Sequence, residues 1–273
     1  MASPPSEQER LRAERIEGEQ QMAAAGLRRR RMLQGGAVLA IAVIVVVVLV
    51  IVSSSDHSGQ AKKLTKSTAN ATQVMIAGWV AGTTQGVGSG GDLTWGSASA
   101  PVIDREYVDL QCSACDDLFV GPSRNGGAEV SLLPYIREGK VQLQIYPLES
   151  VTPTAAMVNT EWGGLLAAGQ QGKGIQYLFT NYVFQPPEGS FTLSNIFDTA
   201  KATQGLNYAQ WNVARTNPDF VSQITAVAQM ENSRGLDETP TTILSNAKGQ
   251  SVSPFVGVYP VAAYEQAIAQ LGG

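Results

Sequence analysis

The stretch that decides the fold is VIDREYVDLQCSACDDLF, residues 102–119. Its first half is rich in β-branched and aromatic side chains and follows a proline, which predicts a strand over 102–110. Cys112-Ser113-Ala114-Cys115 then opens a helical pattern. After a further helical segment, residues 141–146 alternate between two faces and predict a second strand. Strand, helix and parallel strand form a βαβ unit.

The two cysteines are the chemical centre of this unit. A cysteine at a helix N-terminus faces unpaired backbone N–H groups and the positive end of the helix dipole, and both favour thiolate over thiol. The thiolate is the nucleophile of disulfide exchange. Cys115 lies one turn beyond Cys112 on the same helix face and can attack a mixed disulfide formed there. The pattern therefore favours a redox-active pair.

Three other interpretations of the pair compete with redox exchange. A zinc site needs about four ligands, and the chain offers two Cys and a distant His57, its only histidine. A purely structural disulfide would close a very small loop and contribute little. Two inert thiols would tend to oxidise outside the cytoplasm. We expect no metal and no cofactor, and the single histidine also argues against a Ser-His-Asp triad.

Composition limits the class of protein further. The chain has 273 residues, of which 44% are hydrophobic and 15% charged, so it can bury a core. Its formal net charge of −4 gives no long-range attraction to nucleic acid, which we do not expect as a partner.

An apolar segment near the N-terminus predicts a membrane anchor. Residues 32–52 are almost entirely apolar, and a helix of about 20 such residues spans a bilayer. Four arginines, 28–31, precede the segment, which places the N-terminus in the cytoplasm and the rest of the chain outside. A cleaved signal peptide is the alternative, but the leader is long and lacks an A-x-A-like site after Val52.

The chain then divides into a charged cytoplasmic tail (1–31), the transmembrane helix (32–52), a polar linker (53–76) and an outer domain (77–273). Within the outer domain, residues of about 152–234 predict a helical insertion. Residues 82–91 contain a formal G-x-G-x-x-G, but no helical pattern follows it, so we expect a surface loop. Further predicted elements are a strand and turn at 92–96, strands at 241–244 and 251–256, and helices at 155–168, 175–183, 193–202, 220–230 and 259–271.

These motifs together resemble the DsbA-like, thioredoxin-fold disulfide oxidoreductases of bacteria. The resemblance covers roughly residues 77–270 and implies an α/β, thioredoxin-like fold with a central mixed sheet and a helical insertion. The matching segments, in chain order, are GSASAPV (96–102), EYVDLQCSAC (106–115), YIREGKV (135–141), Gly172-Lys173 with YLF (177–179), and Thr239-Pro240-Thr241.

The resemblance also implies roles for single residues. Cys112 is the exposed attacking thiol and Cys115 the buried resolving thiol. Glu106 falls where the family often has a buried acid, whose raised pKa suits a proton relay with Cys115; from the residues alone we would expect an exposed acid at a strand edge. Pro240 would be cis and pack against the pair. The backbone of Thr239 would pair with an extended substrate, and its hydroxyl would donate to the Cys112 thiolate.

Two departures from the family point to a weaker oxidant. The dipeptide between the cysteines is Ser-Ala, whereas the strongly oxidising members have Pro-His. Asp116 and Asp117 follow directly and oppose a nearby thiolate by like charge. We therefore expect the pKa of Cys112 in the upper half of the range of about 3.5–7.5 that activated cysteines span.

The sequence thus predicts an extracytoplasmic enzyme that donates a disulfide from Cys112 and Cys115 to exported proteins with free Cys. A membrane reoxidase, DsbB-like or vitamin K epoxide reductase-like, would restore it. The same parts also suit a reductant in cytochrome c maturation, so the direction stays open. A non-catalytic peptide- or partner-binding module is the other alternative, with a surface lined by Trp79, Trp95, Trp162 and Trp211.

Overall fold

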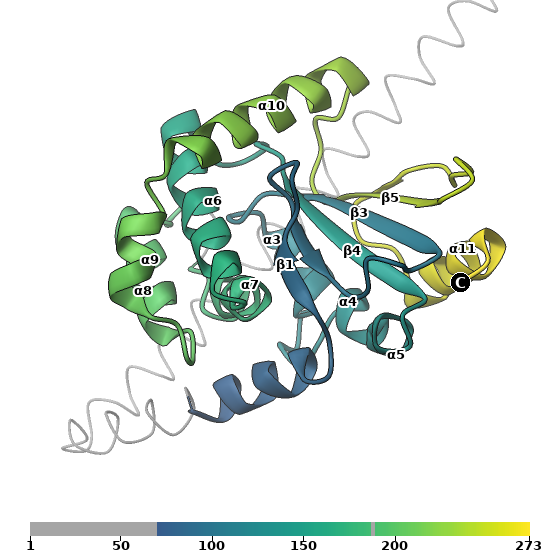
Figure 1. Ribbon diagram of the computed structural model, residues 1–273, viewed down its shortest axis with the longest axis horizontal. Coiled ribbons are helices and arrows are strands. Elements are labelled where there is room, and N and C mark those ends of the chain that lie inside the picture. Colours follow the sequence, from purple (N-terminus) through teal and green to yellow (C-terminus); the bar gives the residue numbers. More distant parts are fainter. Residues whose placement is uncertain (1–69, 187–188) are drawn as a thin grey trace, which may run out of the picture. The chain divides into compact units, whose positions relative to one another are not determined.

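The computed structural model describes residues 70–186 and 189–273 (Figure 1). The predicted cytoplasmic tail and transmembrane helix lie outside the described residues, as does most of the linker. None of the helices that are described combines the length and the apolar character needed to cross a bilayer. The anchor at 32–52 therefore stays a prediction.

A six-stranded mixed sheet forms the centre, as predicted. The order of its strands is β1-β2-β4-β3-β5-β6. The two central strands, β3 and β4, run parallel, and every other neighbouring pair is antiparallel. Their bounds are β1 Gln85–Val87, β2 Leu93–Trp95, β3 Val102–Val108, β4 Val141–Pro147, β5 Thr241–Asn246 and β6 Phe255–Val256.

The crossover between β3 and β4 contains three short helices. They are α3 (Ser113–Phe119), α4 (Ala128–Ser131) and α5 (Leu133–Arg137). The sequence predicted one helix over the last two, but the chain starts a new helix after Leu132. Pro134 lies in the first turn of α5, where its missing N–H costs nothing, whereas inside a longer helix it would remove a hydrogen bond.

The helical insertion packs on the β1, β2 and β4 part of the sheet, while the C-terminal helix α11 (Val261–Leu271) contacts β5. Figure 1 shows the insertion gathered at one end of the sheet and α11 at the other. The α9 helix was not among the predicted segments, because it is short. The insertion consists of α6 (Ala155–Gln170), α7 (Gly174–Val183), α8 (Leu193–Ala202), α9 (Tyr208–Ala214) and α10 (Pro218–Arg234).

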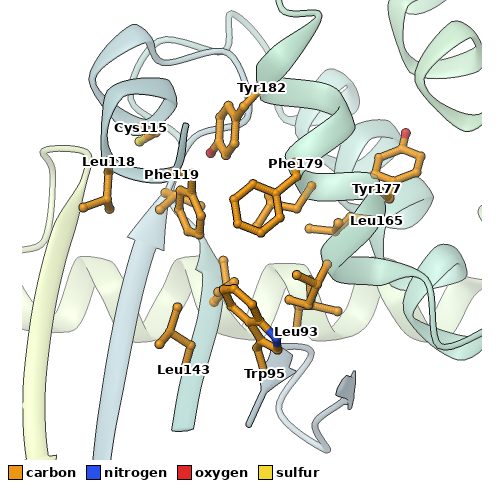
Figure 2. Packing of buried hydrophobic residues seen from close by; sticks show 14 of the residues in the cluster. Leu93, Trp95, Cys115, Leu118, Phe119, Leu143, Leu165, Tyr177, Phe179 and Tyr182 are labelled. Atoms are coloured by element: carbon orange, nitrogen blue, oxygen red, sulfur yellow. The ribbon is translucent and has the colours of Figure 1, made fainter. Parts of the chain in front are cut away.

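Aromatic side chains join α3 to the insertion (Figure 2). Phe119 of α3 stacks on Tyr182 of α7 with ring centroids 5.4 Å apart, and Phe179 meets the edge of Trp95 at 5.6 Å. All four tryptophans are buried, with at most 9% of their surface exposed. The prediction of a docking surface lined by tryptophans is therefore wrong, because all four rings are packed in the core.

Two predicted boundaries need correction at the N-terminal side of the sheet. Residues 70–80 are helical and Ile76 is fully buried, so the folded unit begins before the predicted end of the linker at 76. The predicted loop at 82–91 contains β1, which pairs with β2 as a hairpin. Because a strand and not a helix follows Gly91, the glycine pattern has no phosphate-binding context.

Candidate active site

The cysteine pair lies where β3 passes into α3. Cys112 is the N-cap of α3, with extended backbone (φ −73°, ψ 126°), and its carbonyl accepts the N–H of Asp116 at 3.1 Å. The backbone N–H of Cys112 donates to the Asp109 carbonyl at 3.1 Å, which fixes the turn. Both cysteines are free thiols in this structure. The first thiol is therefore at the helix tip that the sequence predicted.

The exposure of the pair differs from the prediction in one respect. Cys112 keeps only 6% of its surface exposed, so the prediction of an openly exposed attacking thiol is wrong; Cys115 has none, as predicted. The reason is the Thr239-Pro240 loop, which lies against the pair: the Cys112 thiol donates to the Thr239 carbonyl at 3.6 Å. Of the two thiols, only Cys112 retains any exposure to solvent.

The two thiols have opposite pKa shifts. The hydrogen bond from the Cys115 thiol, with further bonds from Thr239 and the N–H groups of Cys115 and Ala114, outweighs burial and lowers the pKa of Cys112 to about 6. Burial, followed by the hydrogen bond and charge of Cys112, raises the pKa of Cys115 well above its ordinary value. The pKa of Cys112 falls in the range that the sequence predicted, and the pair holds one activated thiol and one protonated one.

Asp116 opposes the thiolate less than its position in the sequence implied. Its carboxylate is paired with Arg124 at 2.8 Å. Burial raises the pKa of Asp116 to about 6, against the opposite effect of Arg124. Arg124 reaches this place with a left-handed backbone (φ 57°) and also donates to the Tyr182 carbonyl. A counter-ion from 121–127 thus offsets part of the like charge.

The Thr-Pro corner faces the pair as the resemblance implied, and the Thr239-Pro240 peptide bond is cis. The hydroxyl of Thr239 forms a hydrogen bond with the hydroxyl of Ser150, which follows β4. Thr239 is half-buried and Pro240 buried. Sequence reasoning missed Ser150, because nothing local connects it with a loop so far along the chain.

Asp109 organises the turn beside the pair, and sequence reasoning missed it. One carboxylate oxygen accepts the backbone N–H groups of Ser150, Val151 and Thr152 at 3.0, 2.9 and 2.8 Å. The other accepts the N–H of Gln111 at 2.9 Å and the Thr152 hydroxyl at 2.7 Å. A buried carboxylate with five donors is fully compensated. It ties the start of the cysteine motif to the loop that holds Thr239.

The helical insertion supports the same turn from the other side. The Asn181 amide of α7 donates to the Leu110 carbonyl at 2.9 Å, and the Tyr182 hydroxyl donates to the Asp109 carbonyl at 3.2 Å. From α6, Glu161 accepts a hydrogen bond from the Gln111 amide, and burial raises the pKa of Glu161 to about 8. Sequence reasoning also missed this buried acid, which lies next to the residue that precedes Cys112.

Glu106 is fully buried in the central strand β3, so the exposed strand-edge alternative is wrong. Both of its carboxylate oxygens accept the Thr242 hydroxyl, at 2.9 and 3.0 Å. Burial, together with the neighbouring carboxyls of Asp104 and Glu129, raises its pKa, as the resemblance implied. Within the described residues its side chain hydrogen-bonds to Thr242 and not to Cys115, so a proton relay would need an intervening group.

No protein-family model and no curated protein sequence matches the chain. Solved structures do match. BdbD from Bacillus subtilis is 16% identical, with a TM-score of 0.52, over 70% of this chain and 99% of its own.

Two further structures agree. The thiol-disulfide exchange protein alpha-DsbA2 from Wolbachia pipientis is 16% identical, with a TM-score of 0.50, over 76% of this chain and 98% of its own. A thioredoxin-like oxidoreductase from Silicibacter pomeroyi is 15% identical, with a TM-score of 0.50, over 66% of this chain and 91% of its own. At this identity the likeness concerns the fold, and the described part of the chain has the thioredoxin-like fold of DsbA-type proteins.

Proposed function

We propose that the protein is a thiol-disulfide oxidoreductase that uses Cys112 as the exchanging sulfur and Cys115 as the resolving one. One observation carries the proposal: two thiols one helical turn apart, of which only the first retains solvent access and has a lowered pKa. The similar Wolbachia structure is a thiol-disulfide exchange protein and the Silicibacter one a thioredoxin-like oxidoreductase, which supports the same chemistry on the same fold.

Donation of the enzyme disulfide to a substrate takes two steps. In the oxidised enzyme a substrate thiolate attacks the Cys112 sulfur, the Cys112–Cys115 bond breaks, and the Cys115 thiolate takes up a proton. A second substrate thiolate then attacks the substrate sulfur of the mixed disulfide, and Cys112 leaves as a thiolate. The substrate dithiol is oxidised and the enzyme disulfide is reduced.

The lowered pKa of Cys112 favours donation of the disulfide over reduction. At pH 7 a thiol of pKa about 6 is about ten-to-one thiolate, so it is a good leaving group and the reduced form of the pair is stabilised. The buried, protonated Cys115 does not compete as a nucleophile until a mixed disulfide forms beside it. This favours an oxidant over a reductant for cytochrome c maturation, although one of moderate strength.

The location and the partners complete the proposal. The apolar segment 32–52 would anchor the chain in the membrane, and the arginines before it would place the folded domain outside. Substrates would then be exported proteins with free Cys, which would meet Thr239 and Pro240 beside the pair. A membrane reoxidase, DsbB-like or vitamin K epoxide reductase-like, would restore the disulfide.

Two assays on the full chain in detergent test the proposal. Reactivation of reduced RNase measures disulfide donation, and the equilibrium with glutathione gives the reduction potential of the pair. We expect reactivation that Cys112→Ala abolishes, and a potential more oxidising than that of thioredoxin, about −270 mV. Equal activity of wild type and Cys112→Ala would favour the non-catalytic binding module, and a potential at or below that of thioredoxin would favour the reductant.

A further inference from the structure

A second polar centre lies inside the fold, apart from the two cysteines. Asp104 and Glu106 on β3 and Glu129 on α4 are all 0% exposed. One carboxylate oxygen from each lies within 4.8 Å of the others. Asp104 and Glu106 share a face of the sheet because they are two positions apart on one strand. The crossover helix α4 brings Glu129 to the same place.

These carboxyls are poorly compensated. Within the described residues no donor reaches either oxygen of Asp104 or of Glu129, whose hydrogen bonds with Glu106 need a shared proton. Glu106 itself accepts a bond from Thr242. The ion pairs found in the described residues do not include any of the three. Burying charges without a partner or a cation is costly. The cluster must therefore bind protons or a cation in the folded protein.

A fourth group, from a different element, faces the cluster. Tyr264 of α11 is fully buried, and its hydroxyl also lacks a hydrogen-bond partner. Burial, followed by the charges of Glu106 and Glu129, raises the pKa of Tyr264, so the ring lies within electrostatic reach of the cluster. Its neutral hydroxyl, which lacks a partner, is therefore a candidate for an additional oxygen ligand at this cluster.

We propose that Asp104, Glu106 and Glu129 bind a hard divalent cation, with calcium as the best match. All the candidate donors are oxygens, which suit calcium, magnesium and manganese. An enclosed, all-protein set of carboxylate oxygens suits calcium better than magnesium, which usually keeps several of its waters. Bidentate carboxylates with the Tyr264 hydroxyl would supply the six to eight ligands that calcium takes.

A bound cation would satisfy more of the cluster than protons would. A shared proton joins two oxygens, whereas one ion can contact the orphaned oxygens of Asp104 and Glu129 together. It would join the central strand β3 to α4 and α11. Because the cluster is enclosed, binding would accompany folding, and the cation would stabilise the native state.

The first test measures stability with and without the metal. The full chain, in detergent and stripped with EDTA, is melted alone and with CaCl2, MgCl2 or MnCl2, and CaCl2 is titrated into it by calorimetry. We expect saturating calcium to raise Tm by about 5 °C or more, with a smaller effect of magnesium, and a single class of calcium sites. Absence of any cation effect would overturn the proposal.

Variants separate this cluster from other carboxylates. Asp104→Asn with Glu129→Gln keeps the side-chain shapes and should abolish both the calcium-dependent rise in Tm and the calorimetric signal. Glu231→Gln removes an equally buried carboxylate of α10 and should leave both intact. A rise in Tm that survives in the double variant contradicts the site. The site is also contradicted if lowering the pH raises the Tm of the EDTA-stripped wild-type chain and calcium does not. That result would mean that the carboxyls share protons.

Should the double variant fail to fold, Tyr264→Phe provides the second readout. It removes one hydroxyl from the cluster and leaves the ring in the core. We expect it to weaken calcium binding severalfold at unchanged binding stoichiometry. Unaltered calcium affinity in this variant, together with no calcium in the purified wild-type chain by mass spectrometry, would also overturn the proposal.

Discussion

The two ends of the cysteine motif differ in their surroundings although they lie one helical turn apart. The Cys112 end meets a loop, a helix tip and a thiol that donates to it. Apart from its hydrogen bonds, the Cys115 thiol is fully buried in the apolar core, in the same cluster as Leu118 and Phe119 of its own helix (Figure 2). The first environment favours a negative charge and the second opposes it. The difference teaches that the position of a sulfur relative to donors, and not the motif alone, sets its reactivity.

The largest expected effect separates the two thiols directly. Cys112→Ala should reduce disulfide exchange to the uncatalysed level, because the chain has one other thiol, Cys115, and it is fully buried. In the Cys115→Ala variant, Cys112 should still attack a substrate disulfide, but the mixed disulfide should accumulate because the resolving thiol is absent. Mass spectrometry of the trapped species measures both. A mixed disulfide that forms through Cys115 in the Cys112→Ala protein would reverse the assignment.

Removing the support of the Cys112 end should be the next largest effect. Asp109→Ala leaves several buried backbone N–H groups without an acceptor, so we expect a loss of about 3 kcal/mol or more in the free energy of unfolding. Urea denaturation measures the loss, with the exposed Asp198→Asn as the control, expected to change stability by less than about 0.5 kcal/mol. A small loss at Asp109 would mean that the loop at 150–152 holds its position without the carboxylate.

The pH dependence of stability sharpens the comparison. The folded pKa of Cys112 is lowered from 9.0 to about 6, so its contribution is full above the unfolded value and is lost as pH falls through 6. Reduced wild type should therefore gain about 2–3 kcal/mol over Cys112→Ser between pH 5 and pH 8. Denaturation of both proteins at the two pH values, under reducing conditions, measures the gain. A difference that does not change with pH would contradict it.

The smallest effect concerns one hydroxyl at the Cys112 end. Thr239→Ala removes a hydrogen bond to the thiolate and should raise the pKa of Cys112 by about 0.5 to 1. Thr239→Ser keeps the hydroxyl and should restore the value. The pH dependence of alkylation by iodoacetamide reports the pKa in each variant. Equal values in the alanine and serine variants would show that the hydroxyl has no part in it.

The sequence predicted what depends on local pattern. β-Branched and aromatic residues after Pro101 predicted β3, alternating faces predicted β4, and the C-x-x-C placed Cys112 at a helix tip. The family resemblance added the cis corner at Pro240 and the buried Glu106. It did not predict what depends on distant partners. Thr239 covers Cys112 from 127 positions away, and Thr152 binds Asp109 from 43 positions away. No local signal in the sequence encodes such contacts. The near-complete burial of Cys112 and the hydrogen bonds of Asp109 are therefore seen only in the structure.

The same limit applies to the carboxyl cluster. From the residues alone Glu106 was expected to be an exposed acid at a strand edge, since charged residues are seldom fully buried, and Asp104 was not singled out. Their burial follows from the central place of β3 between two other strands, and Glu129 joins them through the crossover helix. Pattern along one strand shows which residues share a face, but not which face is covered.

The ionisation of Cys112 tests the account most directly. The ultraviolet absorbance of thiolate, followed against pH in the reduced full chain and in Cys112→Ala, gives the pKa of each thiol. We predict one transition near pH 6 that disappears in Cys112→Ala, and no second transition below about pH 9. A single transition close to the ordinary value of a free thiol would contradict the claim that the fold activates this sulfur.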